Sequence, residues 1–255
     1  MKNRVLILSV SRKVSLVKAF KDAGWVVIGQ DKDPNAVALK FCDEIDDFQS
    51  EIKADLIIPT RDAELKQGSY RCSDETIDIC IDKFKFYKWC KANGFQTPEV
   101  YFVKPRVSTS SKETECVWQE FIEGEEYSID CYSSIIDGTP ISIVPRKRLK
   151  VLSGESIQTI TMANDMIIQS TMKLLISLGL KGVSCIQCFV LMDKIVYIDI
   201  NARVGGASIV GLRAGCYFPS WMLQELNGEK VVPQIGNYKV GVMGRSFSDW
   251  TFDEA

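Results

Sequence analysis

The sequence predicts a mixed α/β protein, because buried strands and an amphipathic helix alternate at its start. Residues 4–10 form a continuous apolar run typical of a buried parallel strand. Residues 13–23 carry apolar side chains at helical spacing and stop before Gly24, and residues 26–34 then form a second strand. Strand, helix and strand at this spacing predict a parallel α/β unit, to which residues 55–62 add a third strand.

Paired strands and further helices are expected in the rest of the chain. Residues 76–93 are typical of one helix that Gly94 ends, and residues 187–201 predict a β-hairpin that turns at Met192–Lys194. Another helix is expected over residues 163–178. Five of its apolar side chains should point inward: Ile167, Ile168, Met172, Leu175 and Ile176.

Composition points to a soluble globular protein. The chain has 255 residues, of which 46% are hydrophobic and 25% charged, and its net charge is −2. This balance gives no reason to expect nucleic acid or an anionic membrane as a partner. No apolar run approaches the roughly 18–20 residues that span a bilayer, and the N-terminus lacks the pattern of a signal peptide. We therefore expect a cytoplasmic protein.

The cysteine and histidine content limits which catalytic mechanisms and metal sites the chain can have. The nine cysteines form no framework, and the one close pair, Cys185 and Cys188, would lie on opposite faces of a strand, which disfavours a shared metal. We expect buried free thiols in a reducing compartment. The chain has no histidine, which excludes Ser-His-Asp and Cys-His catalysis and His-ligated zinc.

A dinucleotide-dependent oxidoreductase is disfavoured by the first strand–helix turn. Asp31 ends a strand and could bind a ribose there, as in dinucleotide-binding folds. The turn itself, S-V-S-R-K at residues 9–13, has none of the glycines of the G-x-G-x-x-G motif. Nicotinamide and flavin cofactors are therefore not expected.

The end of the predicted hairpin gathers oxygen-bearing side chains. Asp199 and Asn201 are two residues apart, so they share one face of the strand. If the turn centres on Asp193, Gln187 lies directly opposite Asp199. Hard cations such as Mg²⁺ prefer oxygen ligands, of which few come from protein and the rest from water and phosphate. The alternative is that Asp and Asn merely face water at the end of a strand.

This hairpin and the residues D-I-N-A-R-V-G-G at 199–206 resemble the metal-binding end of ATP-grasp ligases. They are most similar to the large subunit of carbamoyl-phosphate synthases, whose usual form is E-x-N-x-R with a Gln on the preceding strand. The resemblance implies ATP and Mg²⁺ or Mn²⁺ as cofactors, with Gln187, Asp199 and Asn201 as metal ligands. Asp199 stands where that family more often has Glu, which leaves open whether one metal ion binds or two.

The same resemblance assigns basic residues to the phosphates. Lys83, in the middle of the predicted helix, and Lys104, in the strand F-V-K-P-R, would contact them, and Lys104 would also meet the adenine edge. Arg203 would stabilise the transferring phosphoryl group or the acceptor carboxylate. Residues 145–151 alternate, so three basic side chains share one strand face: Arg146, Arg148 and Lys150.

Of these three, Arg148 would face the γ-phosphate or the acyl phosphate. The plainer alternatives are a solvated helix lysine at Lys83 and a solvated basic sheet edge at residues 145–151.

The resemblance also places the adenine and the ribose. An adenine hinge would be formed by four consecutive residues: Gln119, Glu120, Phe121 and Ile122. Gly124 would make a turn, and Glu126 would accept hydrogen bonds from the ribose hydroxyls. The alternative is an acidic hairpin turn that leads into a strand. After the metal hairpin, Gly205 and Gly206 would open a helix whose N-terminal amides could hold an anion.

By this resemblance the chain has an ATP-grasp fold, α/β and α+β in class, with a Rossmann-like pre-grasp domain at residues 1–75 and an ATP-grasp domain at residues 76–255. A small lid would lie at about residues 100–122. The expected reaction is ATP-dependent ligation through an acyl phosphate, with small-molecule carboxylate (or carbamate or bicarbonate) and amine substrates. A homodimer or a partner subunit is possible, and the alternative function is an ATP-binding subunit or regulatory module without turnover of its own.

Three stretches are shorter than their counterparts in that family. Lys104 follows within seven residues of Thr97, fourteen residues separate Lys104 from Gln119, and residues 62–72 are compressed. Serines of V-S-T-S-S-K at residues 107–112 replace the glycines of the family's phosphate loop. We therefore expect segments of a longer natural chain to be absent from this sequence. The intact mass should then exceed 28.7 kDa by several kilodaltons, and a measured mass near 28.7 kDa would contradict this.

Overall fold

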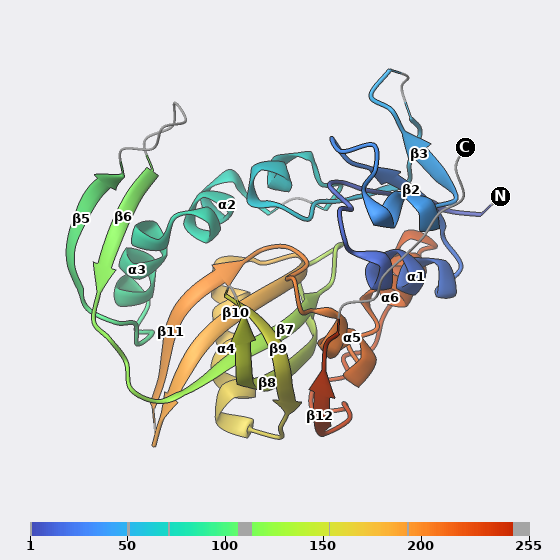
Figure 1. The fold of residues 1–255 in the computed structure, drawn as a ribbon. Coiled ribbons are helices and arrows are strands. Elements are labelled where there is room, and N and C mark those ends of the chain that lie inside the picture. Colours follow the sequence, from blue (N-terminus) through green and yellow to red (C-terminus); the bar gives the residue numbers. More distant parts are fainter. Residues whose placement is uncertain are drawn as a thin grey trace.

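The computed structural model describes six stretches of the chain, with the backbone alone at 102–106 and 114–117: residues 2–49, 52–70, 72–106, 114–152, 154–192 and 194–246. These residues form a four-stranded N-terminal sheet, a six-stranded sheet and a two-stranded ribbon. Figure 1 shows the N-terminal sheet and the ribbon at opposite ends, with the six-stranded sheet below and between them. The arrangement is α/β followed by α+β, as predicted.

The N-terminal sheet is parallel in the order β3-β2-β1-β4. Its strands are β1 (Arg4–Ile7), β2 (Val26–Gln30), β3 (Glu44–Asp46) and β4 (Leu56–Ile58), with helix α1 (Val14–Asp22) after β1 and the 3₁₀ helix η1 (Val37–Phe41) after β2. The predicted parallel unit is confirmed. Strand β3 was not predicted, because three residues are too few to show a period.

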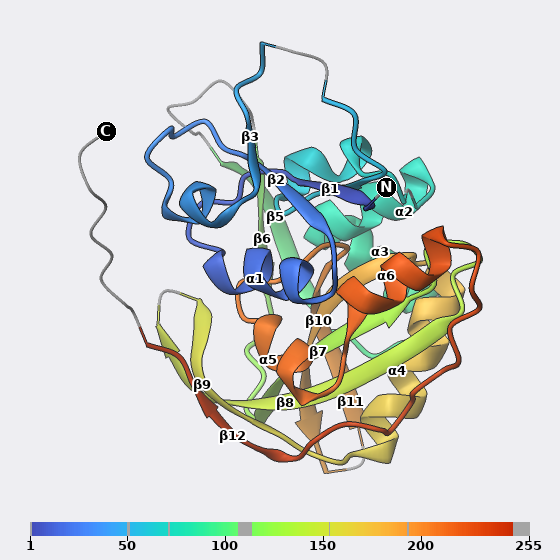
Figure 2. The same ribbon diagram turned by 90° about the vertical axis from the view of Figure 1, so that its right-hand side faces the viewer.

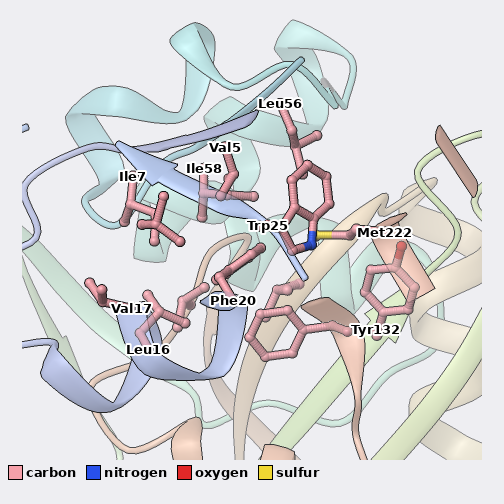
Figure 3. Packing of buried hydrophobic residues seen from close by; sticks show 14 of the residues in the cluster. Val5, Ile7, Leu16, Val17, Phe20, Trp25, Leu56, Ile58, Tyr132 and Met222 are labelled. Carbon is pink, nitrogen blue, oxygen red and sulfur yellow. The ribbon is translucent and has the colours of Figure 1, made fainter. Parts of the chain in front are cut away.

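One apolar cluster joins the N-terminal sheet to the rest of the molecule. Phe20 of α1 packs edge-on against Trp25 and against Phe218 of helix α6 (Phe218–Leu226), with ring centroids 6.0 and 5.9 Å away. The Trp25 indole N–H also donates to the Pro219 carbonyl oxygen at 2.9 Å. Figure 3 shows Met222 and Tyr132, from the C-terminal half, beside these rings. The two predicted domains therefore share a hydrophobic core.

Three short helices lead from β4 to the ribbon: η2 (Asp62–Gln67), α2 (Asp74–Ile81) and α3 (Lys83–Ala92). The prediction of one helix over 76–93 is wrong, because Asp82 breaks it. Asp82 adopts an extended backbone (φ −114°, ψ 109°), and its carboxylate accepts hydrogen bonds from the N–H groups of Phe84 and Lys85. An aspartate that caps in this way competes with helix continuation.

The ribbon consists of β5 (Val100–Arg106) and β6 (Thr114–Gln119), which pair antiparallel. It falls inside the predicted lid at residues 100–122. The serine-containing segment 107–112 lies outside the described residues.

The six-stranded sheet has the order β11-β10-β7-β8-β9-β12 and is antiparallel throughout. Its strands are β7 (Glu125–Ser133), β8 (Pro140–Leu152), β9 (Glu155–Thr161), β10 (Gly182–Leu191), β11 (Lys194–Asn201) and β12 (Gly241–Gly244). β8 lies between β7 and β9, so the alternative of a basic sheet edge at residues 145–151 is wrong. Figure 2 shows this sheet with α4 and α6 beside it.

One face of this sheet is apolar and packs against helix α4 (Asp165–Leu178). The helix was predicted, but Ile176 does not point inward, since 61% of its surface is exposed. The inward positions follow the 3.6-residue period instead. They belong to Ile167, Ile168, Thr171, Leu174, Leu175 and Leu178.

The other face is polar. Residues directly opposite on neighbouring strands share a face. Asp199, Gln187, Ser128 and Arg146 form one such row across β11, β10, β7 and β8, and Asn201, Cys185 and Asp130 form the next. Helix α5 (Ile209–Ala214) contacts β7 and β8 and begins later than the predicted opening at Gly205.

Two predictions made from composition can be compared with the structure. The eight cysteines whose side chains the structure describes are free thiols, and seven of them are buried, Cys42 being half-buried. Among the described residues no helix has the length and apolarity to cross a membrane.

Candidate functional site

The hairpin β10–β11 places Gln187 directly opposite Asp199. This prediction is confirmed, although for a different reason. The strands pair Leu191 with Lys194, whereas a turn centred on Asp193 would pair Met192 with Lys194. Asp193 itself lies outside the described residues. A β-bulge then adds Ile198 to β11 and restores the register at Gln187.

Asp199 also belongs to a chain of contacts among four polar side chains. The Asn201 amide donates to Asp199 Oδ2 at 3.2 Å, and Arg203 Nη2 donates to Asn201 Oδ1 at 2.8 Å. Lys83 Nζ lies 3.9 Å from Asp199 Oδ1 and remains 57% exposed. The break at Asp82 produces this contact, because it puts Lys83 in the first turn of α3, which packs against β11.

Arg203 also connects the hairpin to the N-terminal half of the chain. Its Nε and Nη2 donate to Oδ1 and Oδ2 of Asp62 at 2.7 and 3.2 Å, which is a bidentate ion pair. Sequence reasoning missed Asp62. Its position as the last residue of the third predicted strand was the available signal, since side chains at the carboxyl ends of parallel strands often line sites.

The oxygen donors fit a hard divalent cation. Asp199 offers a carboxylate, and Gln187 and Asn201 offer amide oxygens, which suit Mg²⁺ or Mn²⁺. Among the described residues, no group of three or more His, Cys, Asp or Glu side chains is arranged so that it could hold a metal ion. A single carboxylate is a weak site on its own, so a cation here would need phosphate oxygens to complete its shell.

The predicted adenine hinge connects the ribbon to the large sheet. Gln119 ends β6, and the Glu120 N–H donates to the Glu99 carbonyl oxygen at 2.8 Å, which anchors the segment to the start of β5. Phe121 is 89% exposed and so presents an uncovered ring. The side chain of Lys104 lies outside the described residues, although its strand, β5, is present as predicted.

Glu126 and Arg148 form an ion pair at 2.8 Å between Oε1 and Nη1. Only 6% of the Arg148 side chain is exposed, and its Nη2 also donates to the Gly154 carbonyl oxygen at 2.7 Å. The structure thus joins the predicted ribose ligand to the predicted phosphate ligand.

A buried ion pair lies under the loop that follows β11. Arg146 Nε and Asp130 Oδ2 are 2.6 Å apart, with 2% and 3% of their side chains exposed. Asp130 Oδ1 accepts from the Ser208 hydroxyl at 2.9 Å, and the Ser208 oxygen accepts from the Gly205 N–H at 2.9 Å. Sequence reasoning missed Asp130, although polar residues alternate at 126, 128 and 130. This network fixes the loop that carries Arg203.

Cys185 is not a nucleophile in this site. Burial raises the pKa of its thiol to about 12, and the neighbouring Asp130 carboxylate acts in the same direction. The thiol therefore stays protonated and unreactive at neutral pH.

The fold and this polar face define an ATP-grasp protein. A sequence model for the family described as "ATP-grasp in the biosynthetic pathway with Ter operon" matches residues 112–244, and the chain belongs to this family. It is an ATP-dependent ligase of the ATP-grasp type. The family assignment made from residues 187–206 is confirmed. The similarity to carbamoyl-phosphate synthases and the individual site residues stay predictions.

Solved structures show the same fold at low sequence identity. Phosphoribosylglycinamide synthetase from Anaerococcus prevotii is 16% identical, with 90% of this chain and 76% of that chain covered and a TM-score of 0.67. N5-carboxyaminoimidazole synthetase from Staphylococcus aureus complexed with ADP is 12% identical, with 94% and 81% covered and a TM-score of 0.70. L-amino acid ligase from Bacillus licheniformis is 17% identical, with 91% and 78% covered and a TM-score of 0.61. No curated protein matches the sequence significantly.

Proposed function

We propose that this ATP-grasp protein ligates a carboxylate (or carbamate or bicarbonate) to an amine through an acyl phosphate, with chemistry like that of carbamoyl-phosphate synthase. The observation that carries the proposal is the contact chain Lys83–Asp199–Asn201–Arg203, with Gln187 opposite Asp199. In this chain the oxygens of Asp199 and Asn201 lie between the basic groups of Lys83 and Arg203, which supports a cation site there. Phosphoryl transfer needs little else from a protein, because positioning and charge neutralisation supply most of the catalysis.

Each group has a proposed task. Gln187, Asp199 and Asn201 would hold Mg²⁺ or Mn²⁺, which, when bound, neutralises charge on the transferring phosphoryl group. The cationic side chains of Lys83, Lys104 and Arg148 would hold the phosphates. Arg203 would orient the acceptor carboxylate or the phosphoryl group, and its ion pair with Asp62 fixes its guanidinium plane.

The nucleoside would lie along the segment between the ribbon and the large sheet. The backbone of the hinge would bind the adenine edge, Phe121 would cover the ring, and Glu126 would accept from the ribose after releasing Arg148. The substrates are small molecules, and a homodimer or a partner subunit is compatible with this reading. The free thiols suit a reducing compartment such as the cytoplasm.

The second candidate is an ATP-binding subunit or regulatory module without independent turnover. The Glu126–Arg148 ion pair favours it, because that pair occupies two groups that nucleotide chemistry would use.

One experiment separates the two functions. MgATP is titrated calorimetrically into the purified protein, and ADP release is then measured across a panel of carboxylates paired with amines. We expect Mg²⁺-dependent binding in the micromolar range, about −8 kcal/mol, and ADP release that requires both a carboxylate and an amine. Binding without ADP release across the whole panel would favour the module, and no binding by folded protein would refute both.

A further inference from the structure

A cavity of about 340 Å³ lies between helices α5 and α6 and the segment that leads to β12. Figure 2 shows this segment running from the end of α6 to β12. The walls carry three aromatic side chains, two amides and one ammonium group: Tyr217, Trp221, Tyr238, Gln234, Asn237 and Lys239. The described residues that line it include none of those proposed above for the nucleotide or the metal ion. Its volume lies at the lower end of the range for small-molecule pockets.

Hydrogen bonds hold the walls of this cavity in place. The Lys239 N–H donates to the Ala214 carbonyl oxygen at 2.7 Å, and the Lys239 carbonyl oxygen accepts from the Thr161 hydroxyl at 2.7 Å. Gly215 follows α5 with a φ of +142°, and a Cβ atom there would lie 3.1 Å from the Asn237 carbonyl oxygen. The two walls therefore meet at a glycine, where a side chain would not fit without strain.

The aromatic rings offer apolar surface to a ligand. Trp221 is 7% exposed, and the ring of Tyr217, which is 47% exposed, meets it edge-on with the ring centroids 6.1 Å apart. The Tyr238 hydroxyl already donates to the Met162 carbonyl oxygen at 2.9 Å, so Tyr238 would contribute its ring rather than its hydroxyl. A ligand that fills this cavity should therefore have an apolar or aromatic body.

The indole N–H of Trp221 has no hydrogen-bond partner among the described residues. This group can only donate, and a buried tryptophan N–H usually finds an acceptor, as Trp25 does at the Pro219 carbonyl oxygen. The Trp221 nitrogen is not fully enclosed by protein atoms either. Its N–H therefore meets space in which a ligand could place an acceptor.

Lys239 supplies the charge of this cavity, because the other described residues that line it are neutral. Its side chain is exposed and, within the described stretches, forms no ion pair. Two carboxylates of neighbouring helices do not line the cavity. Burial, and then the Asp165 carboxylate of α4, raise the pKa of Tyr238, and Glu225 of α6 accepts from the Tyr132 hydroxyl at 2.5 Å. Aromatic rings alone would also suit a cation, but an ammonium group in the same wall favours an anion.

We propose that this cavity binds a small organic monocarboxylate with an aromatic body. The ring would lie against Tyr217 and Tyr238, while the carboxylate would accept from the Trp221 N–H and pair with the Lys239 ammonium group. The inference goes beyond the ligase function proposed above and does not depend on it.

The test follows phenylacetate by ligand-observed NMR titration into the full chain. Neutral phenylacetamide and acetate, which lacks the ring, are titrated for comparison. Lys239→Met removes the charge and keeps much of the apolar stem, and Trp221→Phe removes the N–H and keeps a ring. Lys230→Met is the matched control, because Lys230 is an exposed lysine earlier in the same segment that does not line the cavity. If circular dichroism shows that Trp221→Phe does not fold, Tyr217→Leu takes its place, since Tyr217 is only half-buried.

We expect phenylacetate to bind wild type and Lys230→Met equally, and more tightly than phenylacetamide or acetate. Its affinity should fall at least about tenfold in Lys239→Met, as for a lost charge-assisted contact, and about three- to tenfold in Trp221→Phe or Tyr217→Leu. The proposal would be overturned by equal binding in wild type and Lys239→Met, or by phenylacetamide binding as tightly as phenylacetate. Absence of phenylacetate binding by folded wild type would overturn it as well.

Discussion

Asp199→Asn should abolish ATP-dependent turnover while leaving the fold intact. The substitution keeps the shape of the side chain and an oxygen that can accept from Asn201, but it removes the one carboxylate of the candidate metal site. It also removes the anionic partner of Lys83. Loss of groups that merely orient metal ligands costs about 10–100-fold in affinity or activity, so loss of a charged ligand should cost at least about 100-fold. Mg²⁺-dependent ATP binding and ADP release are measured on the same preparation.

The matched control is Asp22→Asn, which neutralises an exposed aspartate at the end of α1, far from the hairpin in sequence and fold. It should bind and turn over like wild type. The double variant Asp199→Ala with Asn201→Ala should bind no MgATP at all. Turnover within about twofold of wild type in Asp199→Asn would show that the carboxylate is structural, because a metal ligand cannot be neutralised at so small a cost.

The hairpin shows what the sequence could and could not predict. Side-chain alternation places Asp199 and Asn201 on one face, and that part of the prediction needs only the two-residue period of a strand. The pairing of Gln187 with Asp199 was correct only because a one-residue bulge offsets a tighter turn. Bulges depend on the neighbouring strands, so a single sequence cannot locate them.

Side-chain contacts between residues far apart in the sequence were the second feature that could not be predicted. Arg203 was predicted to act on substrate, yet its observed partner, Asp62, is 141 residues away. Arg146 was predicted to share one basic strand face with Arg148 and Lys150, yet it is buried against Asp130. Local period and composition carry no information about which strands become neighbours, and that adjacency decides both contacts. The break of the helix at Asp82 could have been predicted from the sequence, because Asp is a preferred residue at helix N-caps.

Asp130→Ala should destabilise the protein by about 3–5 kcal/mol, because it leaves the Arg146 guanidinium buried without a counter-charge. The Arg146 Nη1 atom already lacks a hydrogen-bond partner among the described residues, so little else can compensate. The free energy of unfolding is measured by urea titration with circular dichroism. Glu125→Ala is the matched control, because Glu125 also lies on β7 and pairs with Lys147 of β8, but at an exposed position, where the loss should stay below about 1 kcal/mol.

A second variant separates charge from packing. Asp130→Leu with Arg146→Met removes both charges together and fills similar volume, so it should recover most of the stability lost in Asp130→Ala. It cannot restore the acceptor for the Ser208 hydroxyl, which in turn holds the Gly205 N–H. The recovered protein should therefore be stable yet impaired in ADP release, since the loop that presents Arg203 loses its anchor. If Asp130→Ala costs no more than Glu125→Ala, the buried pair does not support this loop, and the orientation of Arg203 must depend on Asp62 and Asn201 alone.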